Sequence, residues 1–204
     1  MQSQHFPLLY FHIMLFGAAL LFIVQVTRAD TPISMDGMMM KLATENNDAA
    51  AQYFVGRNFL VGKTVRVDKT RAAKWFIQAA RQNHTKAQYE LGRLYLRGDG
   101  VTRNRDVALE LIKRAAQKEH VAAQYELAKL YLNRNNDFAN PGKAVKWLQE
   151  AASNNHPTAM FTLGKLFYEG KRVRPRTEQG LRLLKDAASR GQPDAVRYLK
   201  SIDS

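Results

Sequence analysis

The sequence predicts an all-α solenoid of stacked helical hairpins. Laid against itself at a shift of 36 residues, the chain superposes four segments without gaps, AAQYFVG at 50–56, KAQYELG at 86–92, AAQYELA at 122–128 and TAMFTLG at 158–164. Apolar residues in each unit recur at three- and four-residue steps, which is the period of a helix with one buried face. Glycine, asparagine and aspartate fall between these stretches, where helices should end and begin. Self-similarity at a fixed period of this length is typical of arrays in which each unit packs on its neighbours.

The first 29 residues differ in kind from the rest. Ile13 to Val24 is an unbroken apolar run of 12 residues, too short for the roughly 20 residues of a membrane-spanning helix but typical of a signal peptide. Thr27-Arg28-Ala29 then ends in a small residue before the chain turns polar, so we expect cleavage after Ala29 and a periplasmic or secreted protein. No lysine or arginine precedes the apolar run, which keeps an N-terminal membrane anchor as the alternative.

Residues 30–48 are predicted to form an N-terminal half-repeat or cap helix. Met39, Leu42 and Ala43 stand 36 residues before Trp75, Gln78 and Ala79, in the second half of the first full unit. At the other end, residues 193–204 are predicted to form a C-terminal capping helix that matches the first half of a unit.

Four full units are predicted between these ends, at 49–84, 85–120, 121–156 and 157–192. In each first helix, apolar residues follow the pattern of Ala87, Leu91 and Tyr95. Glycines stand where the first helix should end and a left-handed residue is favoured, namely Gly62, Gly98 and Gly170. Polar N-caps precede the second helix, namely Asp68, Asn104 and Asn140. Small residues, facing the paired alanines of the second helix, are expected to let neighbouring helices approach closely, namely Gly56, Gly92, Ala128 and Gly164.

The units resemble Sel1-like repeats, a branch of the tetratricopeptide-type helical hairpins. The second unit carries most of the resemblance, with Ala87, Leu91, Gly92, Tyr95, Gly98, Gly100, Val101, Ala108 and Ala115-Ala116 at the characteristic positions. Trp75 and Trp147 match the family's tryptophan. The resemblance implies a right-handed superhelix whose first helices line a concave surface. It also implies a role as an adaptor or scaffold, in a family without a common enzymatic activity.

Catalytic and metal-binding signatures are missing from the sequence. It holds no cysteine, no G-x-S-x-G, no H-E-x-x-H and no phosphate-binding glycine loop. His84, His120 and His156 recur at the repeat period, but equivalent positions in stacked hairpins lie roughly 8–10 Å apart or more, too far to share one zinc ion. We therefore expect polar junction residues, and a chain that is not an enzyme and uses no metal, cofactor or small-molecule substrate.

A cation recurs in every first helix. On a helical wheel that starts at Ala87, Arg93 falls nearly opposite the buried face, and the repeat extends this position to Arg57, Arg93, Lys129 and Lys165. We expect all four side chains to face solvent, so that replacing them should touch no core contact. They form either a solvated face with local pairs such as Glu90 to Arg93, or a basic strip for an acidic partner.

The aromatic series Tyr53, Tyr89 and Tyr125 flanks the buried face, and Phe161 continues it. Core or groove-edge packing is expected for these rings, and stacking on a partner is the alternative. Together with the four cations, the three tyrosines are the predicted partner-binding residues.

The predicted function is an exported scaffold that binds a protein partner on the concave face. The alternative uses the net charge, +13 for the full chain and +12 once cleavage removes Arg28, to bind an anionic surface, such as lipid headgroups or envelope polysaccharide. Nucleic acid is not the expected partner, because a signal segment removes the protein from it.

Overall fold

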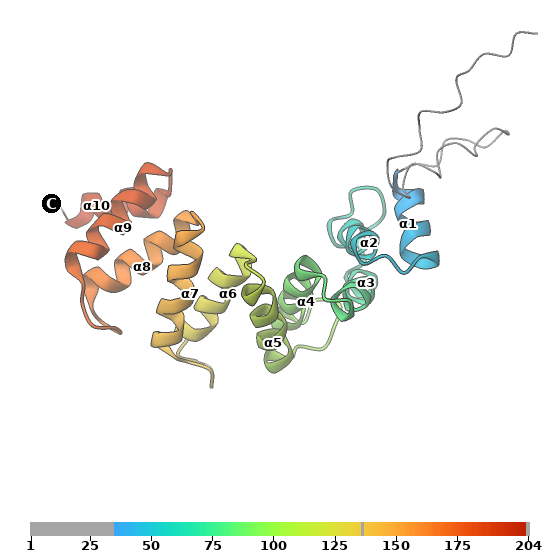
Figure 1. The fold of residues 1–204 in the computed structure, drawn as a ribbon, viewed down its shortest axis with the longest axis horizontal. Coiled ribbons are helices and arrows are strands. Elements are labelled where there is room, and N and C mark those ends of the chain that lie inside the picture. Colours follow the sequence, from blue (N-terminus) through green and yellow to red (C-terminus); the bar gives the residue numbers. More distant parts are fainter. Residues whose placement is uncertain (1–34, 136, 203–204) are drawn as a thin grey trace, which may run out of the picture. The chain divides into compact units, whose positions relative to one another are not determined.

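The computed structural model describes residues 35–135 and 137–202, and all regular secondary structure in these residues is α-helical (Figure 1). The predicted signal peptide, residues 1–29, lies outside the described residues. The helices are α1 (Met35–Glu45), α2 (Ala49–Val61), α3 (Lys69–Arg81), α4 (Thr85–Arg97), α5 (Arg105–Gln117), α6 (Val121–Leu132), α7 (Pro141–Ser153), α8 (Pro157–Glu169), α9 (Thr177–Ser189) and α10 (Pro193–Ile202). The prediction of an all-α chain is confirmed.

The chain divides into two units, residues 1–38 and 39–204. Only Met35–Met38, which begin α1, are described in the first unit. In the second unit the helices pair as hairpins, α2 with α3, α4 with α5, α6 with α7 and α8 with α9. Each hairpin then packs on the next through α3 and α4, α5 and α6, and α7 and α8, and α10 packs on α9 (Figure 1). Contacts therefore follow chain order, as expected for an array of repeats.

The predicted helix ends are observed. Gly62, Gly98 and Gly170 are left-handed with φ values of 74°, 77° and 63°, so each first helix of hairpins one, two and four ends at a residue without a Cβ penalty. The side chains of the second-helix N-caps accept a hydrogen bond from a backbone N–H of the first turn, at Asp68, Asn104 and Asn140. The fourth hairpin has Arg176 at this position, with no side-chain cap.

Close helix crossings depend on the small residues of the first helices. A Cβ on Gly92 would lie 2.7 Å from Cγ1 of Ile112 and 3.2 Å from the carbonyl oxygen of Ala108. Gly56 makes the same approach to Phe76, and Gly164 to Gly180 and Leu184. The expectation of a close approach is confirmed, but the contact is with the middle of the second helix and not with the alanine pair near its end.

The core combines small side chains at the crossings with large buried side chains from both helices of each hairpin, such as Leu127 and Phe167 in first helices. Phe76, Ile112, Leu148 and Leu184 occupy equivalent positions and are fully buried. The alanine pairs of the second helices are mostly buried between successive hairpins. Trp75 and Trp147 pack against the core but remain half-buried.

Each junction between successive repeats contains a residue in the left-handed backbone conformation, which was not predicted from the sequence. Asn47, Asn83, Glu119, Asn155 and Gly191 stand 36 residues apart, with φ values of 52°, 63°, 60°, 60° and 78°. Asparagine and glycine adopt this conformation readily, whereas glutamate does so at a cost. Glu119 is therefore a strained position of the array.

A buried glutamine follows each of the first three junctions. Gln52, Gln88 and Gln124 are almost fully buried, and their amide Nε2 donates to the carbonyl oxygens of Ala43, Ala80 and Ala116 at 3.4–3.5 Å. The carbonyl oxygens of Ala80 and Ala116 also accept from the backbone N–H of Asn83 and Glu119, so the glutamine gives each a second donor. Each glutamine thereby ties one unit to the next.

Candidate interaction surface

The three predicted tyrosines lie half-buried at the junctions between successive first helices. Each ring packs on the histidine that precedes the next first helix, with centroid distances of 4.9 Å for Tyr53 and His84, 4.7 Å for Tyr89 and His120, and 4.8 Å for Tyr125 and His156. Each tyrosine ring therefore packs on a histidine and still exposes part of its surface. Such aromatic pairs hold both side chains in one orientation.

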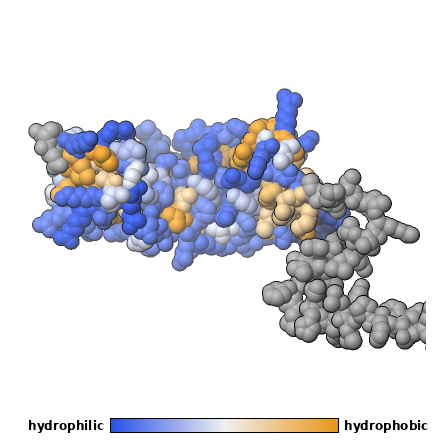
Figure 2. All heavy atoms as spheres, turned by 90° about the horizontal axis from the view of Figure 1, so that it is seen from above, coloured by the Kyte–Doolittle hydropathy of each residue, from blue (hydrophilic) through white to orange (hydrophobic). Residues whose placement is uncertain are grey.

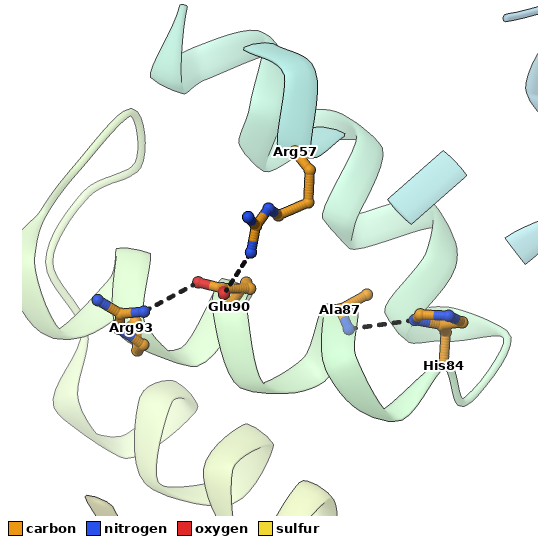
Figure 3. Close-up of polar contacts among 5 residues, drawn as sticks. All are labelled: Arg57, His84, Ala87, Glu90 and Arg93. Atoms are coloured by element: carbon orange, nitrogen blue, oxygen red, sulfur yellow. Dashed lines mark hydrogen bonds and ion pairs between the residues drawn. The ribbon is translucent and has the colours of Figure 1, made fainter. Parts of the chain in front are cut away.

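The histidines have a second role as helix N-caps. Nδ1 of His84, His120 and His156 accepts a hydrogen bond of 3.2 Å from the backbone N–H of Ala87, Ala123 and Ala159, respectively. Figure 3 shows the first of these contacts at the start of α4. Burial lowers the pKa of all three imidazoles below the ordinary value, and the nearby Lys86 lowers the pKa of His84 further. The rings are therefore neutral near pH 7, with the proton on Nε2, since Nδ1 is the acceptor.

The predicted cations lie beside these rings. The guanidinium of Arg93 stands 5.5 Å from the centroid of Tyr89, and Nζ of Lys129 stands 5.8 Å from the centroid of Tyr125. Lys129 also pairs with Glu126 at 3.0 Å. Two such groups form, and we call each a junction cluster. One contains Tyr89, Glu90, Arg93 and His120, and the other contains Tyr125, Glu126, Lys129 and His156.

Glu90 of the junction cluster is the buried member of a charged triad. Its carboxylate is only 11% exposed and lies between two arginines, 3.2 Å from Nη1 of Arg93 and 3.6 Å from Nη1 of Arg57 (Figure 3). Arg93 itself is 32% exposed. Arg57 is 46% exposed, as expected. The expectation that replacing these two arginines touches no contact of the fold is wrong, because the neighbouring helix α2 brings Arg57 to the same buried carboxylate. Removing either arginine would weaken the compensation of a buried charge.

The fourth hairpin departs from this arrangement. Lys165 lies 5.0 Å from the ring centroid of Tyr198 in α10 and pairs with Glu169 at 3.7 Å. Tyr198 Oη donates a 3.0 Å hydrogen bond to Glu169. Burial together with this bond raises the pKa of Tyr198 to about 12. Burial opposes ionisation of Glu169, but Tyr198 and the lysines at 165 and 171 outweigh it and hold the pKa of this carboxyl below its ordinary value. Lys165 thus helps to attach α10.

The groups at this surface are suited to contact with a partner. Among the described residues, no group of three or more His, Cys, Asp or Glu side chains could hold a metal ion. The junction clusters offer the rings of Tyr89 and Tyr125 and the guanidinium of Arg93, and tyrosine and arginine are both enriched at protein interfaces.

A comparison with models of known families decides the identity of the repeat. The Sel1 repeat model matches residues 49–84, 85–120, 121–156 and 157–192, which together make up more than half of the chain. The protein belongs to the Sel1 repeat family. Sel1 repeat proteins are generally protein–protein interaction scaffolds. A comparison with curated proteins gives no match.

Several solved structures are similar to this chain. The protective antigen c5321 of uropathogenic Escherichia coli has a TM-score of 0.76 and 29% identity over 80% of this chain and 35% of its own. A Sel1 repeat protein from Oxalobacter formigenes has a TM-score of 0.72 and 25% identity over 82% of this chain and 49% of its own. The immunity protein Pa5087 from Pseudomonas aeruginosa has a TM-score of 0.50 and 29% identity over 72% of this chain and 55% of its own. The chain therefore spans about a third to a little over half of these proteins.

Sequence reasoning missed the capping role of the histidines and the burial of Glu90. A signal for the first was present, since His84 stands 36 residues after Asp48, whose side chain accepts from Ala51 N at the start of α2. The burial of Glu90 had no such signal, because it depends on contacts between two hairpins.

Proposed function

We propose that the chain is an exported scaffold that holds a protein partner against the first helices of its hairpins, on what the family resemblance implies is the concave face. The junction clusters carry the proposal, because they repeat an aromatic ring and a paired cation in successive units. Export rests on the apolar run before Ala29, and an N-terminal anchor is the alternative. Among the described helices, none is long and apolar enough to cross a membrane.

The junction clusters also favour one mode of recognition. Tyr89 and Tyr125 are already held by their histidines, so a partner that contacts them pays little further side-chain entropy. The carboxylates of Glu90 and Glu126 balance the adjacent cations. We therefore propose that aromatic contact and mixed charge select the partner, with acidity of the partner as a contribution to the rate of encounter.

Binding to an anionic surface is the second candidate. The net charge of +13 supports it, since a strongly basic chain is attracted to acidic lipid or polysaccharide whatever the local geometry. The dependence of binding on salt concentration distinguishes the two functions. Attraction of exposed charges over more than about 10 Å is screened at about 0.1 M salt, whereas contacts that bury aromatic rings persist.

Retention of native partners by purified variants tests the scaffold. The variant Tyr125→Ala/Lys129→Gln removes the exposed part of one junction cluster and leaves the Arg57–Glu90–Arg93 triad intact. Lys146→Gln, on the exposed side of α7, is the matched control for loss of one positive charge. We expect the double variant to lose a partner that wild type and control retain at low and high salt. Equal retention by all three proteins would contradict the proposal.

A further inference from the structure

The connection between α2 and α3 exposes apolar side chains that the core does not use. Val61, Val65 and Val67 are 58%, 38% and 52% exposed. Figure 2 shows apolar surface at the end of the array that carries the first hairpin. Because β-branched apolar side chains gain from burial, three exposed valines within seven residues would be stabilised by contact with another apolar surface.

The repeat itself does not require these valines. Positions equivalent to Val61 hold Arg97, Asn133 and Glu169, and positions equivalent to Val67 hold Arg103, Ala139 and Pro175. Val65 has equivalents in Val101 and Val173, which are partly buried against a core cluster, whereas Val65 is 38% exposed. Two of the three exposed valines are thus particular to this hairpin.

Cations alternate with the valines. Lys63 and Arg66 are exposed and form no ion pair with any residue that the structure describes, and the same holds for Lys74 and Arg81 on α3. The nearest acid in the sequence is Asp68, at the start of α3. Its carboxylate accepts a hydrogen bond from Arg71 N at 2.8 Å and pairs with Arg71 Nε at 3.2 Å. The tip therefore presents positive charge with no acid to balance it.

Both ends of this segment are fixed, so its tip has a defined place. Gly62 N–H donates to Asn58 O and Asp68 N–H donates to Phe59 O, each at 2.9 Å. A shallow hollow borders the tip on α2, lined by Tyr53, Phe54, Arg57, Asn58, Val61 and Lys63. Apolar groups and cations share this hollow, which suits an acidic headgroup attached to hydrocarbon.

We propose that the segment 61–67 binds the surface of an anionic lipid bilayer, with the three valines in the headgroup and acyl boundary and Lys63 and Arg66 at the acidic headgroups. Interfacial segments combine these two features, because apolar burial and attraction to anionic lipid then act at the same depth. A soluble polyanion would use the cations alone and leave the valines exposed. The inference rests on the second candidate function, binding to an anionic surface, and not on the scaffold role. Tyr53 and Arg57 border the hollow, but the valines and cations of 61–67 belong to neither junction cluster.

Binding to vesicles of one-third anionic and two-thirds neutral phospholipid tests the proposal. We expect Lys63→Gln/Arg66→Gln to weaken binding about 25-fold, since each cation near such a surface contributes about fivefold. Val61→Ser/Val67→Ser should weaken it about tenfold at unchanged charge. The fourth hairpin supplies the control Lys171→Gln/Arg174→Gln, which removes two cations at equivalent positions where Glu169 and Pro175 replace the valines. This control should bind as wild type does.

A dye at the tip locates the contact directly. The chain has no cysteine, so Val67→Cys can carry a single polarity-sensitive label, with the equivalent Pro175→Cys as the comparison. Anionic vesicles should shift the emission of the label at 67 to shorter wavelength and leave the label at 175 unchanged. Equal loss of binding in both cation variants, wild-type binding by the valine variant, or no shift at 67 would each overturn the proposal. Weaker binding by Lys63→Gln/Arg66→Gln, with wild-type binding by the valine variant, would instead indicate that the segment recognises negative charge without burial in the bilayer.

Discussion

Gly92 lies at the crossing of α4 and α5, and its replacement by leucine should destabilise the array. The Cβ alone would stand 2.7 Å from Ile112 Cγ1 and 3.2 Å from the carbonyl oxygen of Ala108. Ile112 is fully buried, so it cannot turn away into solvent. The remaining carbons of a leucine would therefore push α4 and α5 apart.

The size of the effect follows from two opposed contributions. Overpacking of a filled core costs up to about 3 kcal/mol, and a leucine in place of glycine returns about 0.8–1 kcal/mol of helix propensity. The net loss is about 2 kcal/mol. For a chain of this length 1 kcal/mol corresponds to about 2–4 °C, so the melting midpoint should fall by about 4–8 °C.

Thermal unfolding followed by the helical circular dichroism signal measures this change. Gly142→Ala is the matched control, because a Cβ at Gly142 meets only the side-chain oxygen of Asn140, at 3.4 Å. That substitution should raise the midpoint slightly, by the helix propensity alone. A Gly92→Leu midpoint equal to that of wild type would refute the assigned crossing.

Three further predictions follow from other positions. Glu119→Asn should stabilise the protein by about 1 kcal/mol in chemical denaturation, because asparagine tolerates the φ of 60° that glutamate resists, and a loss of stability would contradict this reasoning. The lowered pKa values of His84, His120 and His156 mean that the unfolded chain takes up protons first as pH falls. Their contribution is therefore complete above about pH 6.5 and is lost as pH falls through the folded values, so the urea midpoint should drop on acidification and drop less in His120→Asn. Intact-mass analysis of the exported protein should give a chain that starts at Asp30, whereas a full-length species extracted from membranes would establish the anchor.

Local residue types predicted most of the fold correctly. Gly62 and Asp68 mark the end of one helix and the start of the next by backbone preferences that hold in any surroundings. The repeat strengthens these predictions, because the same residue types recur at the same position in several hairpins. The left-handed junctions were missed because Glu119 carries no such preference, although Asn47 and Gly191 in the same register do.

Only part of the candidate surface could be predicted from the sequence. Helical periodicity placed Arg93 opposite the buried face, but a wheel treats α4 as an isolated helix. In the array, α2 brings Arg57 to Glu90, and Tyr89 receives the ring of His120 from the following junction. Contacts between hairpins depend on how the units stack, and that information is not present in the pattern of one helix.

Crosslinking in the native cell tests the scaffold most directly. A photoreactive residue placed at position 129 lies in a junction cluster, and the same residue at position 146 lies on the exposed side of α7. We predict a discrete protein adduct from position 129 that is absent from position 146 and disappears when Tyr125→Ala is added. Identical adducts from both positions, or none from position 129 while the folded protein is present, would contradict a partner-binding surface on the first helices.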